Sequence, residues 1–139
     1  MKTKKNLSVP IVLIIALVGL TLQACRKYPD GPLFSFRSRI ERVANTWRVD
    51  SYIKNGTDYT YLMAGYTETY TKDGNYFYTW DGSSGTGVWT FQDNDSDILL
   101  TGIRNQRTYT LIILRLEEKE FWYYYIDGND RKEFHMVQS

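Results

Sequence analysis

The stretch that decides the fold is 107-RTYTLIILRLEEKEFWYYYIDGNDRKEFHMV-137. Its three runs, 107–116, 120–126 and 131–137, are rich in Ile, Leu, Thr, Tyr and Val, which favour extended backbone. Short polar segments separate the runs, and the second of them, 127–130, is typical of a hairpin turn. The stretch therefore predicts three consecutive strands that pair antiparallel with their neighbours.

The same pattern continues upstream. Residues 47–54 alternate, which predicts a half-buried strand with Trp47, Val49, Ser51 and Ile53 on one face. Asn-Gly at 55–56 and Asp-Gly at 73–74 predict turns. Segment 59–63 fits a short helix, a loop or a strand. Further strands are expected at 66–71, 76–80, 86–91 and 98–101, with loops at 81–85, 92–96 and 102–105.

Regular turn spacing sets the fold class. Turn signals recur roughly every 8 to 12 residues and separate about eight or nine short strands, as in barrels and sandwiches. No helix separates one strand from the next, so neighbours should pair antiparallel. We therefore expect an all-β, up-and-down antiparallel barrel, with a two-sheet β-sandwich as the alternative.

One helix is expected before the first strand, at 34–44. Phe36, Ile40 and Val43 share one face of that helix, and Ser35 could cap its start. Charged residues fill the opposite face, as in a short amphipathic helix that packs against the barrel.

Residues 1–24 have the features of a secretory signal peptide. Lys2, Lys4 and Lys5 precede an apolar run at 11–22. That run of about 12 residues is shorter than the roughly 20 that a spanning helix needs. The expected cut lies between Ala24 and Cys25, and its loss would make the chain weakly acidic, because the leader holds three lysines and no acid.

Residues 22–25, Leu-Gln-Ala-Cys, resemble the lipobox of bacterial lipoproteins. The resemblance implies that Cys25 carries lipid and anchors the protein to a membrane. Arg26 stands where an Asp would signal retention at the inner membrane, so the resemblance implies the outer membrane of the cell envelope. Residues 25–33 would be the lipidated Cys and a flexible tether, and 34–139 the barrel domain.

Composition and motifs argue against several function classes. One Cys and one His exclude a Cys-based zinc cluster or a two-His metal site, and a net charge of +1 gives no reason to expect nucleic acid. Asp93, Asp95 and Asp97 begin like a calcium loop, but Ile98 and Arg104 stand where Gly and Glu are needed. No nucleophile motif accompanies His135, interpreted as an ordinary strand residue. We expect no enzyme, no cofactor and no bound metal.

The pattern resembles the small lipocalin-like domains of Gram-negative envelope lipoproteins. The residues that carry the resemblance are Asn45-Thr46-Trp47 at the first strand, the hairpin 71-TKDGNY-76 and Gly87-Val88-Trp89. It implies a cup-shaped barrel able to hold a small apolar ligand. In such barrels an Arg usually packs on the first Trp, and Arg131 is the candidate.

Aromatic residues make up 16% of the chain, and runs 76–80 and 121–126 place them on both faces of a strand. The outer aromatics would be covered by the helix, a partner or a ligand, or would simply tolerate water. The first hypothesis is a binding module for a small hydrophobic ligand. The alternative is an accessory protein of the envelope that docks protein or glycan through surface aromatics. For the binding module, the candidate liners are Trp47, Trp80, Trp89 and Trp122.

Overall fold

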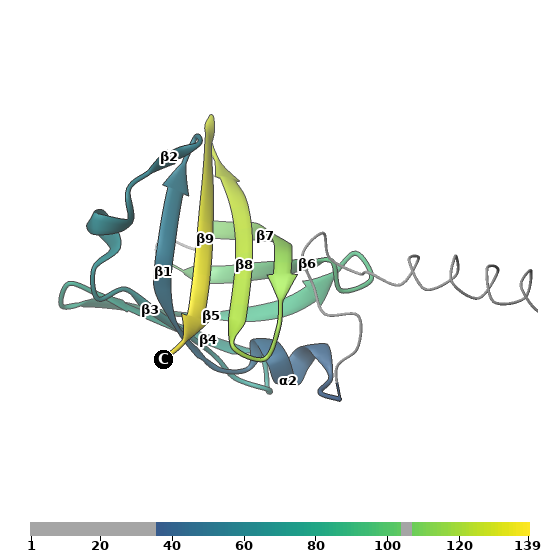
Figure 1. The fold of residues 1–139 in the computed structure, drawn as a ribbon. Helices are drawn as coiled ribbons and strands as arrows, with labels where there is room; N and C mark the ends of the chain where they lie inside the picture. Colours follow the sequence, from purple (N-terminus) through teal and green to yellow (C-terminus); the bar gives the residue numbers. More distant parts are fainter. Residues whose placement is uncertain (1–35, 104–106) are drawn as a thin grey trace, which may run out of the picture.

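The computed structural model describes residues 36–103 and 107–139 (Figure 1). The predicted signal peptide, Cys25, the tether and Ser35 lie outside these residues. In the part of the chain that is described, no helix is both long and apolar enough to cross a membrane.

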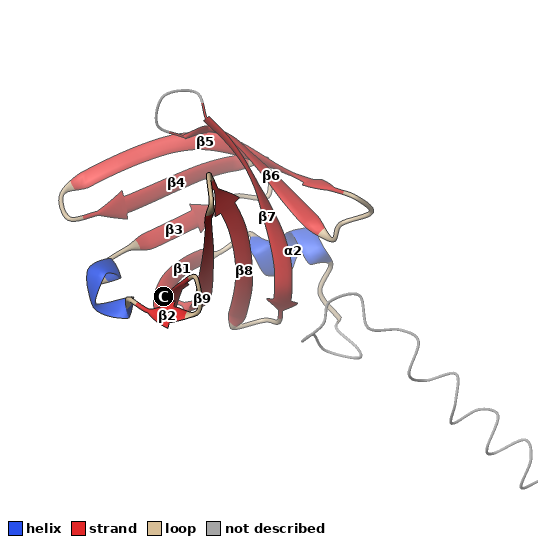
Figure 2. Ribbon diagram, turned by 90° about the horizontal axis from the view of Figure 1, so that it is seen from above, coloured by secondary structure: helices blue, strands red, loops and turns tan. Residues whose placement is uncertain are grey.

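Within the described residues, nine antiparallel strands follow the short helix α2 (Figures 1 and 2). Each strand from β3 to β9 pairs with the next along the chain, which confirms the predicted meander. The elements are α2 (Arg39–Val43), β1 (Thr46–Lys54), β2 (Thr57–Asp58), the 3-10 helix η2 (Thr60–Met63), β3 (Thr67–Tyr70), β4 (Asn75–Trp80), β5 (Ser83–Gln92), β6 (Asp97–Ile103), β7 (Arg107–Leu116), β8 (Glu120–Asp127) and β9 (Asp130–Gln138).

Strand β1 closes the sheet into a barrel of eight strands, with β2 as an extra strand. It pairs with β9 along its length, from Trp47 opposite Gln138 to Lys54 opposite Lys132. Its pairing with β3 covers only Thr46 to Arg48. Further along, β1 pairs with β2, and η2 occupies the space between β2 and β3 (Figure 2). The barrel is thus tightly closed at one end and wider at the other.

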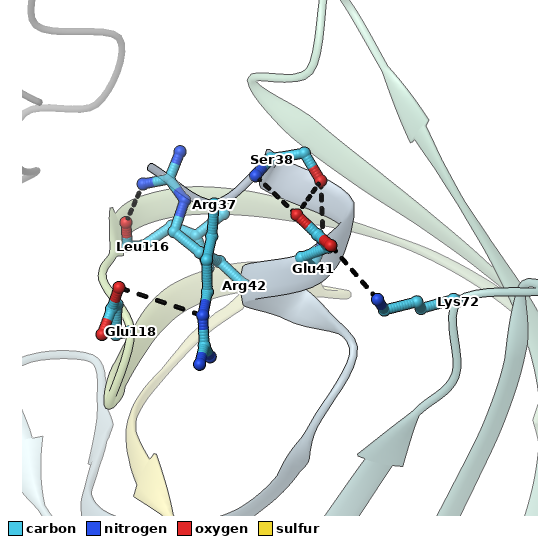
Figure 3. Close-up of polar contacts among 7 residues, drawn as sticks. All are labelled: Arg37, Ser38, Glu41, Arg42, Lys72, Leu116 and Glu118. Carbon is cyan, nitrogen blue, oxygen red and sulfur yellow. Dashed lines mark hydrogen bonds and ion pairs between the residues drawn. The ribbon is translucent and has the colours of Figure 1, made fainter. Parts of the chain in front are cut away.

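Helix α2 lies beneath the tightly closed end, opposite the β8–β9 turn (Figure 1). Ser38 begins it through a capping box, in which its hydroxyl accepts from the Glu41 N–H and the Glu41 carboxylate accepts from the Ser38 N–H. These bonds and Lys72, 3.2 Å away, lower the pKa of Glu41 to about 2. The guanidinium of Arg42 donates to the Leu116 carbonyl, which ties the helix to β7 (Figure 3).

The structure confirms a helix before the first strand, but the helix is shorter than predicted. It begins at Arg39 rather than at 34, and Ser38 is its cap. Val43 is fully buried, but Ile40 is half exposed and Phe36 is fully exposed. The expected apolar face is thus wrong for two of its three residues.

A β-bulge corrects the predicted face of β1. The register with β9 shifts between Val49 and Ser51, so Asp50 is an extra residue. A single extra residue turns the following side chains to the other face. Tyr52 is consequently buried, where simple alternation had placed Ile53.

Arginine and histidine side chains of the neighbouring strands β7 and β9 cover the outer aromatics of β8. His135 stacks on Trp122 with ring centroids 4.1 Å apart, and the Arg115 guanidinium lies 4.7 Å from the Trp122 ring centre. Arg131 lies in the same way over Tyr124, at 4.0 Å. This also corrects the expectation for Arg131, because β9 places it at the end opposite Trp47. Side chains of the barrel wall therefore cover two of the outward-facing aromatics of β8, Trp122 and Tyr124.

Candidate ligand-binding site

A partly enclosed cavity of about 490 Å³ occupies the wider end of the barrel. Arg107, Tyr109 and Leu111, in the first half of β7, line the cavity. Helix α2 is bonded to Leu116, at the other end of the same strand. The cavity therefore opens away from α2. Beneath it, the closed end is packed with side chains that are almost fully buried: Val43, Trp47, Tyr70, Trp89, Leu116 and Phe121.

Alternation along the strands builds the cavity wall. Tyr76, Tyr78 and Trp80 are two residues apart on β4, so they point to the same side of the sheet. Tyr123 and Tyr125 do the same on β8. The resulting lining is mainly aromatic, and it includes tyrosine hydroxyls and four charged side chains.

Ring contacts hold this wall in place. Tyr66 stacks on Tyr78 with centroids 6.2 Å apart and meets Trp80 edge-on at 6.5 Å. On the opposite side Tyr109 meets Tyr125 at 5.0 Å. Each such aromatic pair contributes about 0.5–1.5 kcal/mol, which stabilises the arrangement of rings in the wall.

Glu68 is a buried carboxylate at the inner end of the cavity, and only 3% of its surface is exposed. Four tyrosine hydroxyls donate to it. Those of Tyr66, Tyr76 and Tyr123 reach Oε1 at 2.7, 2.9 and 2.9 Å, and that of Tyr70 reaches Oε2 at 2.9 Å.

Burial dominates the acid–base behaviour of this group. It raises the pKa of Glu68, although the four hydroxyl donors favour the ionised form and oppose the increase. Burial and the charge of Glu68 also raise the pKa values of Tyr66, Tyr70 and Tyr123 well above normal. The tyrosines therefore keep their protons and remain donors to Glu68.

Three charged side chains stand at the mouth. Asp127 accepts from Lys132 at 2.6 Å and lies 3.9 Å from Arg107. The bond from Lys132 lowers the pKa of Asp127. Because Arg107 and Lys132 face the single carboxylate of Asp127, these three side chains carry a slight excess of positive charge. Lys132 also lies 5.8 Å from the centre of the Tyr125 ring in the cavity wall.

The four candidate tryptophans occupy different places. Trp80 lies on the cavity wall. Trp47 and Trp89 are buried in the closed end, where their indole N–H groups donate to the carbonyls of Val43 and Thr71. Trp122 lies on the outer face against His135. The structure thus brings one of the four to the cavity.

The Glu68 cluster was missed from the sequence, where the acids were considered mainly as turn residues. A signal was present, because Glu68 stands in the middle of a strand, two residues from both Tyr66 and Tyr70. An acid flanked in this way shares the buried face of its neighbours. The contributions of Tyr76 and Tyr123 depend on strand pairing and have no local signature.

The other candidates have structural partners. Asp95 pairs with Arg39 at 2.7 Å, and His135 bonds with Glu133 at 2.7 Å on the outer face. Among residues 36–103 and 107–139, no group of three His, Cys, Asp or Glu side chains could hold a metal ion.

Comparison with known proteins does not add a family. No family model matches the chain, and no curated protein matches it. Function must therefore be inferred from the chemistry of the cavity.

Proposed function

We propose that the protein is a lipocalin-like binding module, which holds a small, mainly hydrophobic ligand in the barrel cavity. The supporting observation is the cavity of about 490 Å³ with its aromatic wall. This volume lies within the roughly 300–1,000 Å³ of typical ligand sites. An eight-stranded barrel is also just wide enough for one small ligand when part of its interior is unfilled.

The alternative, docking of protein or glycan through surface aromatics, has less support. Trp122 and Tyr124 are the outward aromatics of β8, and Arg115, His135 and Arg131 already cover them. The inward aromatics Tyr78, Trp80 and Tyr125 instead line the cavity of about 490 Å³, which favours the barrel interior as the binding site.

Removing Trp80 should weaken binding of an apolar probe. A suitable probe is 4-phenylbutan-1-ol, measured by isothermal titration calorimetry on the full-length protein in detergent, with titrations into detergent alone subtracted. Trp80→Ala should weaken binding about fivefold, because one aromatic contact is worth about 1 kcal/mol.

Trp122→Ala is the matched control, since it removes the same side chain from the outer face. Its affinity should equal that of the unmodified protein. An unmodified protein that binds no probe, or an equal loss in both variants, would contradict a ligand site in the barrel.

We further propose that a lipid on Cys25 anchors this module to the outer membrane of the cell envelope. The support is the lipobox-like sequence 22–25 and Arg26 after it. More than one acyl chain would give stable anchoring, since each buried CH₂ contributes about 0.8 kcal/mol.

Cys25→Ala should release the protein from the membrane fraction and abolish incorporation of radiolabelled palmitate. Tyr28→Ala, in the predicted tether, should leave both unchanged. A Cys25→Ala protein that remains in the outer-membrane fraction would exclude this anchor.

A further inference from the structure

Glu68 brings a buried carboxyl group to the cavity, and no cationic side chain in the described part of the chain pairs with it. Among the described residues, its hydrogen bonds come from tyrosine hydroxyls, and no ion pair includes it. Arg107 and Lys132, the cationic side chains of the cavity lining, stand at the mouth with Asp127. A buried carboxylate is stabilised far more by a cation than by neutral donors.

The inner end of the cavity presents acceptors. Each tyrosine hydroxyl has one proton and donates it within the cluster, either to Glu68 or, between Tyr66 and Tyr76, to the other hydroxyl 3.3 Å away. Each hydroxyl oxygen has two lone pairs, and the contact between Tyr66 and Tyr76 uses at most one of them, so accepting capacity remains. Oε2 of Glu68 receives a single bond, against three at Oε1, and so retains accepting capacity. A complementary ligand group must donate hydrogen bonds.

The aromatic wall also suits a positive charge. Tyr66, Tyr78 and Trp80 line the same cavity as Glu68, and aromatic ring faces attract cations, most strongly where water is excluded. An anionic group would instead meet the charge of Glu68 in a medium that screens poorly. The slight positive excess at the mouth suits a ligand whose outer end is neutral or acidic.

We propose that the cavity binds a small ligand with a protonated amine at one end and an apolar body. The ammonium group would donate to Glu68 and to the hydroxyl oxygens beside it, and the apolar body would lie against Trp80 and Tyr125. This inference rests on the proposed function, because it names the ligand class of the same cavity.

Three probes of matched shape test the ligand class. They are 4-phenylbutylamine, 4-phenylbutan-1-ol and 4-phenylbutyrate, titrated calorimetrically into the full-length protein in detergent at pH 7.5. The amine should bind at least about tenfold tighter than the alcohol, since its hydrogen bonds to Glu68 are charge-assisted. The carboxylate should bind more weakly than the alcohol.

Glu68→Gln should abolish the advantage of the amine, so that the amine and the alcohol bind with about equal affinity. Glu118→Gln is the matched control, because Glu118 is a half-exposed carboxylate paired with Arg37 beside α2 (Figure 3). It should retain the preference for the amine. Circular dichroism establishes that each variant is folded.

The outcomes separate the two proposals. If the alcohol binds and the amine binds no tighter, the cavity is a ligand site but the amine inference is wrong. If none of the probes binds, both proposals fail. An amine preference that survives in folded Glu68→Gln also overturns the inference. If Glu68→Gln does not fold, the ranking of the three probes on the unmodified protein still decides it.

Discussion

Trp47→Ala is expected to lower the free energy of unfolding by about 3–5 kcal/mol, the usual cost of removing a large buried aromatic side chain. Trp47 is fully buried at the closed end, where its ring lies 5.7 Å from that of Phe121. Its indole N–H donates to the Val43 carbonyl at 2.9 Å. Truncation would therefore open a void and remove a bond that joins β1 to the end of α2.

Urea unfolding followed by circular dichroism measures this loss. Trp122→Ala provides the control, because Trp122 is only partly buried and stacks against His135 on the outer face. It should cost about 1 kcal/mol or less. Trp47→Phe should lie between the two, since it keeps most of the packing and loses the bond to Val43. Similar losses in Trp47→Ala and Trp122→Ala would show that the closed end is not the centre of stability.

Turn chemistry is the part of the fold that local sequence predicts best. Asn55 and Gly56 both adopt positive φ, at 50° and 82°, as a tight hairpin requires. Gly74 does the same at 88° between β3 and β4. Because such angles are costly for most residues, the residues that tolerate them mark the turns, and the turns determine the meander.

Local sequence does not predict the structure of segments whose residue types occur in both loops and strands. Ser83, Ser84 and Gly85 resemble a loop but form the start of β5, paired with Trp80, Thr79 and Tyr78. The turn itself consists of Asp81 and Gly82. Here tertiary pairing decides the structure and local preference does not.

Alternation predicts a face only while the register is unbroken. The bulge at Asp50 reverses the second half of β1, and nothing in residues 47–54 announces it. The predicted start of the helix was wrong for a related reason. The capping box of Ser38 and Glu41 determines where the helix begins, and the spacing of apolar residues does not. The bulge in β1 and the start of the helix thus each depend on a single residue, Asp50 and Ser38 respectively.

The candidate site was predictable only in outline. The barrel follows from strand number and turn spacing, but of the four tryptophans proposed as liners only Trp80 lies on the cavity wall. The Glu68 cluster joins β3, β4 and β8, and Tyr123 is distant from Glu68 in the sequence. Contacts of that kind follow from strand order and register, which a single sequence does not give.

Gly85→Ala is expected to destabilise the barrel by about 1–3 kcal/mol, the range for a forced repacking of a filled interior. Gly85 lies directly opposite Tyr78 in the β4–β5 ladder. A Cβ at this position would lie 2.8 Å from Cζ and 2.9 Å from the hydroxyl oxygen of Tyr78, and closer still to Cε1. These separations are well below van der Waals contact, so the Tyr78 ring would have to move.

The displaced ring is part of the cavity wall, so stability and binding should change together. Tyr78 is 9% exposed and stacks on Tyr66, which donates to Glu68. Ser84→Ala, at the exposed neighbouring position, should have little effect on either property. In the double variant Gly85→Ala/Tyr78→Leu the clash is absent, so its loss in unfolding free energy should be smaller than the sum of the two single losses. Strictly additive losses in urea unfolding would show that Gly85 does not make room for the ring. Subadditive losses would show that the missing side chain of Gly85 sets the position of Tyr78, and with it the shape of the cavity.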